Sequence, residues 1–349
     1  MLVTCNASSS RSFRVFVLLF LSLSPPGWAQ PTELEPAYRD NFYDVVVRGP
    51  ESWIVGYYGT ILHSRDRGLT WIIQNSKTRE ALFRVAFLDR NTGWVSGSYG
   101  TFLTTRDGGK SWQKQDTQTE EHLFGFQFLD AQLGRAVGSR GTVLRTENGG
   151  KSWTSSSVGE DIIVNDVRFL NPQEGWVVGE FGRIYTTKDG GLTWRKQKSP
   201  IEVSFVSGES RNLFRLLLRN AREGWAFGLD SVILQTQNGE RWEIANSNGA
   251  RAPMTQRHHL FSAAFFNGTK WAVGERGTVL VSSAGNHHWK SAGLTVPPVS
   301  LNGIAFGDDG LGFIVGNRGT ILRTENAGKD WKSRKIIAGE SGRGVGQLQ

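Results

Sequence analysis

The sequence is poor in the residues that crosslink small secreted domains or build thiol and metal sites. It contains one cysteine (Cys5), ten prolines and six histidines among its 349 residues. A single cysteine excludes a disulfide framework. No apolar run approaches the roughly 20 residues that a membrane-spanning helix needs. Charged residues make up 21% of the chain and hydrophobic residues 38%, which is typical of a globular protein and argues against disorder.

The first 29 residues are typical of a secretory leader. Arg11 and Arg14 precede the apolar segment 15–23, and the small-residue site Gly27-Trp28-Ala29 follows it. We therefore predict that residues 1–29 are a signal peptide that is cleaved off together with Cys5. The mature chain is then expected in the periplasm or an equivalent extracytoplasmic compartment.

The charge of the mature chain is mildly basic. The whole chain carries a formal charge of +8, and the leader takes two arginines and no acidic residue with it, which leaves +6. Nucleic-acid binding needs clustered Lys and Arg, whereas these are spread along the sequence. We predict no nucleic-acid partner.

Glycine and tryptophan, in contrast, are abundant, with 43 and 13 residues. The tryptophans form two series that recur every 41 to 49 residues, and periods of this size indicate repeat architectures. One series is Trp71, Trp112, Trp153, Trp194, Trp242, Trp289 and Trp331. The other precedes it in each unit as Trp53, Trp94, Arg135, Trp176, Trp225, Trp271 and Phe313. Together they contain every tryptophan of the mature chain.

Each unit reads as four short antiparallel strands. An alternating segment such as 83–87 comes first, and β-branched runs separated by Gly-containing gaps of two to five residues follow. A single four-stranded sheet cannot bury both of its faces, so the units must pack on one another, and radial packing gives a propeller. We predict an all-β fold: a monomeric seven-bladed β-propeller over 42–337, with a lead-in at 30–41 and a flexible tail at 338–349.

A polar turn closes each unit, and in five units it has the pattern Ser/Thr-x-Asp/Asn-x-Gly-x-x-Trp. Unit five is one residue shorter, and unit six is degraded, with Ala284 at the Asp/Asn position. Asp or Asn side chains in a turn bond nearby backbone N–H groups, and the following Trp buries a large ring between neighbouring sheets. A residue needed once for catalysis would not recur in six of the seven units, so we predict a structural role. The side chains at the Asp/Asn position are Asp66, Asp107, Asn148, Asp189, Asn238 and Asn326. The turns resemble Asp-boxes, also called BNR repeats.

The region 42–337 resembles the photosystem II stability/assembly factor family. The resemblance rests on units such as Gly93-Trp94-Val95-Ser96-Gly97 and Gly175-Trp176-Val177-Val178-Gly179, with the boxes that follow them. It implies an exported, non-enzymatic propeller that binds a protein partner during assembly of a membrane complex. The last three units lack the Arg-rich segment expected of photosynthetic members, which favours a general assembly or binding role at a membrane or envelope protein.

One face of the propeller is the predicted binding face. With the strands of a unit labelled a to d, the b–c turns and the d–a connections share that face. Both long insertions, 195–212 and 243–259, are d–a connections, and binding loops tolerate such changes in length. Aromatic and Arg side chains, which are favoured in interaction cores, recur in the b–c turns. We predict a binding rim formed by Tyr58, Tyr99, Arg140, Phe181, Arg276 and Arg318, extended by Arg251 and Arg257. The alternative is that these are ordinary exposed turn residues.

An enzyme is the competing interpretation, because Asp-boxes also occur in sialidases and other propeller glycosidases, and a glycan-binding module is related to it. That chemistry needs an arginine set, a nucleophile and an acid. No tyrosine follows the Arg-Ile-Pro segment that marks sialidases; the nearest string, Arg183-Ile184-Tyr185, is a repeat strand. The pairs His258-His259 and His287-His288 lack a carboxylate at ligand spacing. We predict no enzyme activity, metal, cofactor or small-molecule substrate.

Overall fold

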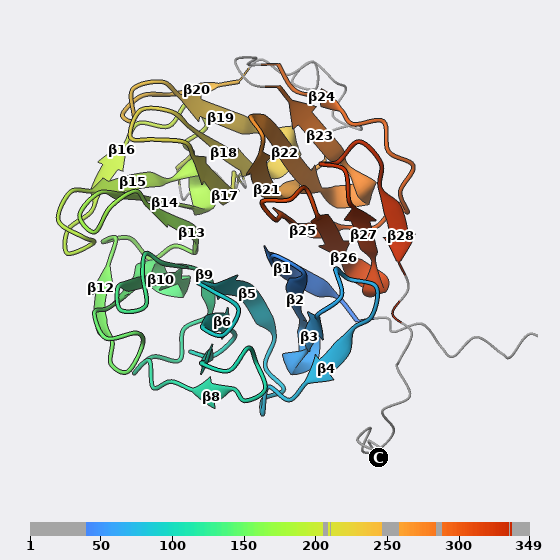
Figure 1. Cartoon of the computed structure of the whole chain (residues 1–349). Coiled ribbons are helices and arrows are strands. Elements are labelled where there is room, and N and C mark those ends of the chain that lie inside the picture. Colours follow the sequence, from blue (N-terminus) through green and yellow to red (C-terminus); the bar gives the residue numbers. More distant parts are fainter. Residues whose placement is uncertain are drawn as a thin grey trace, which may run out of the picture. The chain divides into compact units, whose positions relative to one another are not determined.

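The computed structural model describes residues 40–204, 209, 211–245, 258–283, 288–334 and 336. They form seven four-stranded antiparallel sheets arranged in a ring, as Figure 1 shows, and this confirms the predicted seven-bladed propeller. None of the described residues forms a helix long and apolar enough to cross a membrane. The leader 1–29, most of the lead-in, the tail 338–349 and the rim residues Arg251 and Arg257 lie outside the described residues. Those predictions remain predictions.

Every blade is a run of four consecutive strands, and we number the blades 1 to 7 in chain order. The innermost strands a are β1 (Phe42–Arg48), β5 (Leu82–Phe87), β9 (Leu123–Phe128), β13 (Val164–Phe169), β17 (Leu213–Leu218), β21 (Leu260–Phe266) and β25 (Leu301–Phe306). Strands b are β2 (Glu51–Gly56), β6 (Gly93–Gly97), β10 (Gly134–Gly138), β14 (Gly175–Gly179), β18 (Gly224–Gly228), β22 (Thr269–Gly274) and β26 (Gly312–Gly316).

The outer half of each blade is shorter. Strands c are β3 (Ile61–Ser64), β7 (Phe102–Thr105), β11 (Thr142–Thr146), β15 (Ile184–Thr187), β19 (Ile233–Thr236), β23 (Val279–Ser282) and β27 (Ile321–Thr324). The outermost strands d are β4 (Ile72–Gln74), β8 (Gln113–Lys114), β12 (Thr154–Ser157), β16 (Arg195–Gln197), β20 (Trp242–Ile244), β24 (Lys290–Ser291) and β28 (Lys332–Arg334).

The hydrophobic core lies between blades rather than within one. In one cluster, Val46, Trp53 and Val55 of blade 1 pack against Leu82 and Phe87 of blade 2. Trp53 is fully buried and stacks on Phe87, with ring centroids 3.8 Å apart. A buried indole removes roughly 200 Å² from water, worth about 5 kcal/mol at 25 cal/mol per Å². Packing between blades therefore supplies most of the stability.

Hydrogen bonds between turns define the two faces of the ring. On one face the closing turn bonds the a–b turn, as from Gly108 N to Asn91 O (2.9 Å); we call it the box face. On the other face the b–c turn bonds the connection to the next blade, as from Gly100 N to Glu121 O (2.9 Å); we call it the b–c face. This is the division that the strand order predicts.

A second contact repeats between neighbouring blades. The strand-b side chain donates a hydrogen bond to a carbonyl in the closing turn of the next blade: Trp53 Nε1 to Gly108 O (3.3 Å), Trp94 Nε1 to Gly149 O (3.4 Å) and Trp176 Nε1 to Gly239 O (3.2 Å). Arg135, which replaces Trp in blade 3, donates from Nε to Gly190 O at 2.7 Å. We call this contact the inter-blade clasp.

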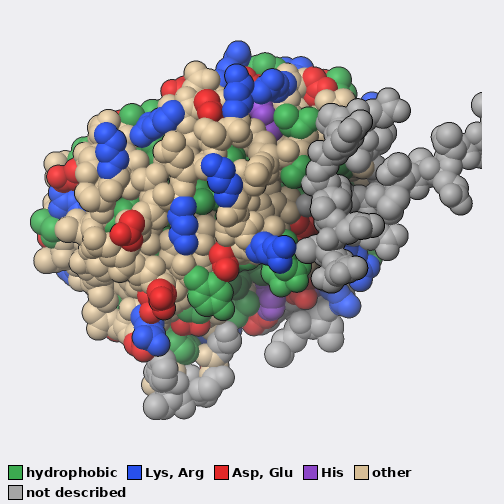
Figure 2. Space-filling view, turned by 90° about the horizontal axis from the view of Figure 1, so that it is seen from below, with side chains coloured by type: hydrophobic (Ala, Val, Ile, Leu, Met, Phe, Trp, Pro, Cys, Tyr) green, Lys and Arg blue, Asp and Glu red, His purple; other side chains and the backbone are tan. Residues whose placement is uncertain are grey.

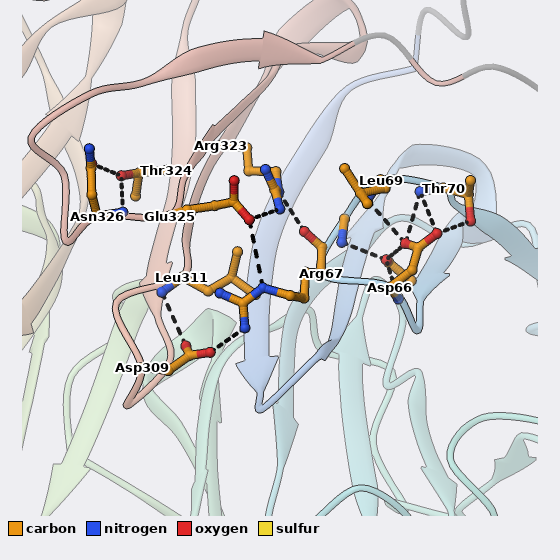
Figure 3. Close-up of polar contacts among 12 residues, drawn as sticks. Asp66, Arg67, Leu69, Thr70, Asp309, Leu311, Arg323, Thr324, Glu325 and Asn326 are labelled. Atoms are coloured by element: carbon orange, nitrogen blue, oxygen red, sulfur yellow. Dashed lines mark hydrogen bonds and ion pairs between the residues drawn. The ribbon is translucent and has the colours of Figure 1, made fainter.

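The ring closes between blades 7 and 1 without a shared strand, because each of these blades has its own four strands. Phe313 occupies the Trp position of blade 7 and has no donor. Arg323 on β27 takes over, donating from Nε to Arg67 O at 2.5 Å (Figure 3). Arg67 in turn pairs with Asp309, and its Nε lies 3.7 Å from Glu325. Asn302 Nδ2 also donates to Phe42 O at 2.7 Å.

The closing arginine gives a testable prediction. Arg323→Met keeps the apolar stem but leaves Arg67 O without its donor, and hydrogen bonds from charged groups contribute about 1.5–3 kcal/mol. We expect the variant to lose about 2 kcal/mol in urea unfolding followed by tryptophan fluorescence.

Arg145 is the matched control, because it pairs with Glu147 as Arg323 pairs with Glu325 but its side chain donates to no neighbouring blade within the part of the chain that the structure describes. Arg145→Met should cost less than about 1 kcal/mol, as partly exposed ion pairs do. Equal losses in the two variants would show that Arg323 does not close the ring.

Candidate functional site

The Asp and Asn side chains of the closing turns face their own turn. Asp66 accepts from Leu69 N (3.0 Å), Thr70 N (2.9 Å) and Thr70 Oγ1 (2.6 Å), and Ser64 Oγ donates to it at 2.8 Å (Figure 3). The same pattern recurs at Asp107, Asn148, Asp189 and Asn326. In the shortened turn of blade 5, Asn238 accepts from Glu240 N and Arg241 N. Each side chain braces the turn that carries it.

The tryptophans that follow these turns pack between blades. Five are buried, and two, in blades 4 and 7, are half-buried. The buried ones are Trp71, Trp112, Trp153, Trp242 and Trp289, and the half-buried ones are Trp194 and Trp331. The box glycine leaves room for a ring of the preceding blade: a Cβ on Gly68 would lie 2.3 Å from Phe313. The box face is thus built mainly for packing.

The b–c face carries the predicted rim residues at one repeated position. Each is the first of two successive left-handed residues, as in a type I′ hairpin turn, which favours Asn-Gly. The seven turns have positive φ at Tyr58 (49°), Tyr99 (49°), Arg140 (52°), Phe181 (56°), Asp230 (53°), Arg276 (53°) and Arg318 (59°). A non-glycine residue there costs roughly 1–2 kcal/mol. Large side chains are therefore held in a conformation that they disfavour.

Most of these side chains reach solvent. Tyr58 is 67% exposed and Tyr99 is 63% exposed. Arg140, Arg276 and Arg318 are also exposed, whereas Phe181 and Asp230 are half-buried. These are the residues at the tips of the seven b–c turns.

The next blade holds the strained backbone in place. Tyr99 N donates to His122 Nδ1 and Asp230 N to His259 Nδ1, each at 3.2 Å. Arg318 N donates to Asn41 Oδ1, also at 3.2 Å. In each of these three turns the acceptor is the residue just before strand a of the following blade. This support explains how these three turns keep a left-handed residue without glycine or asparagine.

A set of residues that sequence reasoning missed lies further in on the same face. Every innermost strand has a β-bulge after its first residue, and the extra residue is unpaired, as at Tyr43 between the pairs Phe42–Gly56 and Asp44–Val55. The bulges recur in the same register in all seven blades. The bulge residues, which we call the collar, are Tyr43, Phe83, Phe124, Asn165, Phe214, Phe261 and Asn302, and all are half-buried.

Aromatic contacts connect the rim to the collar. Tyr99 lies 4.7 Å from the His122 ring, and His122 lies 5.9 Å from Phe124. Phe124 stacks on Phe83 at 5.1 Å, and Phe83 lies 5.9 Å from Tyr43. The recurrence of an aromatic residue at the second position of five strands a was the available sequence signal. The alternation of apolar and polar residues did not reveal these positions, because a bulge shifts the strand register and leaves no mark in that pattern.

Charged side chains and side chains that could bind a metal do not cluster in the described part of the chain. On the side of the propeller seen in Figure 2, Lys and Arg are interspersed with Asp and Glu. No group of three or more His, Cys, Asp or Glu side chains that could hold a metal ion occurs among residues 40–204, 209, 211–245, 258–283, 288–334 and 336 that the structure describes. The histidine pairs divide: His258 and His259 lie on the b–c face, and His287 is outside the described residues.

The fold and its repeats define the chain as a seven-bladed repeat propeller, and sequence comparison gives its family. The model of the family "photosynthesis system II assembly factor YCF48" matches residues 70–162, 110–199 and 152–248. These segments together span 70–248, just over half of the chain. The chain belongs to this family. Comparison with curated proteins gave no match.

Solved structures agree on the fold. The chain is similar to YCF48 bound to a D1 peptide, with 21% identity and a TM-score of 0.65, over 83% of this chain and 93% of that one. It is similar to YCF48 from Cyanidioschyzon merolae at 20% identity and a TM-score of 0.64, over 83% and 97%. An ancestral GH74 enzyme has a TM-score of 0.67 at 15% identity, over 86% of this chain but 47% of the enzyme.

The closing turns make a prediction about pH. Burial opposes ionisation of Asp107, but hydrogen bonds from Ser111 and Thr105 outweigh it and lower the pKa of Asp107 from 3.8 to about 2. A carboxylate with a lowered pKa stabilises the fold above pH 3.8, and this contribution is lost as the pH falls toward 2. Wild type should therefore lose more stability between about pH 4 and pH 2 than Asp107→Asn does.

Asn148 makes the equivalent contacts in blade 3, so Asp107→Asn should change the stability at neutral pH little. Asp107→Ala should lower it by about 1 kcal/mol, the typical net contribution of such hydrogen bonds. Urea unfolding at about pH 7 and about pH 2.5 separates these outcomes. Identical pH profiles for wild type and Asp107→Asn would refute the assignment.

Proposed function

We propose that this chain is a non-enzymatic binding protein that holds a segment of a protein partner on its b–c face. The observation that carries the proposal is the row of seven strained turns, which present Tyr58, Tyr99, Arg140, Arg276 and Arg318 to solvent. At roughly 1 kcal/mol or more per residue, seven such residues cost about as much as the net stability of a typical domain. Strain of this kind persists mainly at functional positions.

The chemistry of the b–c face suits a peptide segment. Exposed Tyr and Arg are enriched in the centres of protein interfaces, and half-buried collar rings offer apolar surface without a large change in conformation. The aromatic path from Tyr99 through His122 to Phe83 makes this surface continuous from the rim inward. A related propeller, YCF48, has been solved with a D1 peptide bound, which supports peptide binding in this family.

The partner follows from the family and the leader. Members are described as photosystem II assembly factors, and residues 1–29 have the features of an export signal. We propose that the partner is a subunit of a membrane or envelope complex and that the monomeric propeller binds it outside the cytoplasm. The three rim arginines favour an acidic segment of that subunit.

Glycoside hydrolysis, the competing function, is not favoured by the carboxylates of the inner strands. It needs a carboxylic acid that is protonated near neutral pH beside a second carboxylate. Asp44 is 3% exposed and Asp166 is fully buried, and arginines lie within 4 Å of both. Burial opposes ionisation of Asp166, but Arg168, Arg215 and Arg84 outweigh it and lower its pKa. Asp166 is therefore unsuited to act as a general acid.

A photo-crosslinking experiment tests the binding face. A photoreactive phenylalanine analogue is placed at Tyr99 on the b–c face or at Leu192 in a closing turn of the box face, two positions that are 63% and 62% exposed. In an envelope fraction of the host, we expect Tyr99 to crosslink a defined protein and Leu192 not to. Arg140→Ser, Arg276→Ser and Arg318→Ser combined should abolish that crosslink.

A further variant separates binding from folding. Tyr58→Asn, with the probe kept at position 99, places the preferred residue of a type I′ turn at a strained position, so the unfolding midpoint should stay the same or rise while crosslinking from position 99 is lost. Crosslinking from Leu192 alone, or equally from both faces, would contradict the proposal. Turnover of an aryl glycoside or a sialoside by the purified protein would support the enzyme instead.

A further inference from the structure

A cavity of about 320 Å³ lies inside the ring, lined by residues of innermost strands from several blades. Four arginines line it: Arg48 on β1, Arg84 on β5, Arg168 on β13 and Arg215 on β17. Asp44 is the one acidic residue in the lining. None of the seven collar residues lines it, so the cavity is separate from the b–c face and goes beyond the function proposed above.

Two of these arginines donate to backbone carbonyls, Arg48 Nε to Phe87 O at 2.7 Å and Arg168 Nη1 to Val167 O at 2.9 Å. The other two have only distant acidic partners. Arg84 lies 3.9 Å from Asp44 and 3.8 Å from Asp166, and Arg215 Nε lies 3.9 Å from Asp166. These are ion pairs but are longer than hydrogen bonds. Arg168 Nη1 comes closer, 3.3 Å from Asp166. The four arginines and the two buried aspartates leave an excess of two positive charges within the cavity, while the exposed Asp308 attracts Arg48 from outside the lining.

Several guanidinium donors remain without an acceptor in the described part of the chain. Arg84 Nε, Arg215 Nε and Arg215 Nη1 are buried and have no hydrogen-bond partner there. Side-chain exposure is 11% for Arg84 and 12% for Arg215. An unpaired buried donor costs about 1–3 kcal/mol, and more when it is charged. The arrangement is therefore suited to receive acceptor atoms from a bound anion.

Electrostatics agree with the geometry. Burial lowers the pKa of Arg168 to about 10, against the attraction of Asp166. Burial also lowers the pKa of Arg84, and Arg215 adds repulsion. Arg168 stays protonated near neutral pH. These arginines form a desolvated cationic cluster that an anion would stabilise.

The cavity has an entrance and an apolar side. Arg48 and Leu88, both exposed, line it at the ends of their strands, so it reaches solvent at the box face. Val46, Phe126 and Ile304 form part of its remaining wall. A volume of about 320 Å³ is at the lower end of the range for small-molecule sites, roughly 300–1,000 Å³. The site would fit a compact ligand with one charged end and a short apolar body.

We propose that this cavity binds a small organic dianion, either a phosphate monoester or a short dicarboxylate, entering from the box face. Arg84 and Arg215 donate to its oxyanion, Arg168 and Arg48 complete the charge balance, and the wall of Val46, Phe126 and Ile304 holds its carbon atoms. A doubly charged ligand matches the excess of two positive charges. A monoanion leaves one of them uncompensated.

Isothermal titration of the mature protein at fixed ionic strength tests the site, with inorganic phosphate, glycerol 1-phosphate, succinate and acetate as probes. We expect one glycerol 1-phosphate or succinate per chain, with acetate and inorganic phosphate at least tenfold weaker. The organic dianion that binds more tightly shows whether the site prefers a phosphate or a carboxylate group. No saturable binding of either organic dianion below about 10 mM, or inorganic phosphate binding tightest, would overturn the proposal.

The variants are Arg215→Gln in the cavity and Arg241→Gln as the matched control, an exposed arginine in the closing turn of blade 5. Charged hydrogen bonds contribute about 1.5–3 kcal/mol, so Arg215→Gln should weaken binding by about 10-fold or more and Arg241→Gln by less than about 2-fold. If Arg215→Gln fails to fold, Arg48→Gln at the exposed mouth replaces it, with an expected loss of at least about 3-fold. Equal weakening by cavity and control variants would indicate attraction by net charge and overturn the site.

Discussion

The packing of side chains between blades, reinforced by a clasp hydrogen bond at five of the seven interfaces, is the interaction on which the rest of the structure depends. Trp225 and Trp271 pack there without an acceptor among the described residues. A strand-b side chain reaches across to the closing turn of the next blade, from Trp53 to Gly108 O and from Trp94 to Gly149 O. The indole packing supplies most of the free energy, and the hydrogen bond fixes the ring direction and the distance between blades. Where the tryptophan is replaced, another side chain donates instead, as Arg135 does in blade 3 and Arg323 at the closure.

A rigid ring gives its two faces different roles. Closing turns hold their own Asp or Asn side chains, so the box face is mostly occupied with packing. The b–c face is different, because its turns keep left-handed residues such as Tyr99 and Arg140 and its bulges leave aromatic collar residues half-buried. Both features cost folding free energy, and the packing and hydrogen bonds between blades offset that cost. Recognition on this face and an anion site within the ring are compatible, since they involve separate residues.

The period of the tryptophans was enough to predict seven blades of four strands, because each indole is a packing unit that must recur once per blade. The sequence also shows where another residue replaces a tryptophan of the series, but it does not show what that replacement does. Nothing in the sequence says that Arg135 donates where Trp would, or that Phe313 is compensated by Arg323 on the next strand. The rim positions followed from turn spacing, whereas the collar did not, because bulges depend on pairing. Arg84 and Arg215 read as polar positions of alternating strands, and only the ring places them around one cavity.

The most direct test of the clasp compares two buried tryptophans at the same strand-b position that differ in their hydrogen bond. Trp94 donates to Gly149 O, whereas the ring of Trp271 packs against Gly328 and its Nε1 has no acceptor among the described residues. Trp94→Phe and Trp271→Phe make the same change in side-chain size and keep an aromatic ring beside Phe128 and Phe306, so urea unfolding compares the two sites. We expect Trp94→Phe to cost about 1–2 kcal/mol more, because a buried carbonyl loses its donor. Equal losses would mean that the indoles act by packing alone and would contradict the role of the clasp.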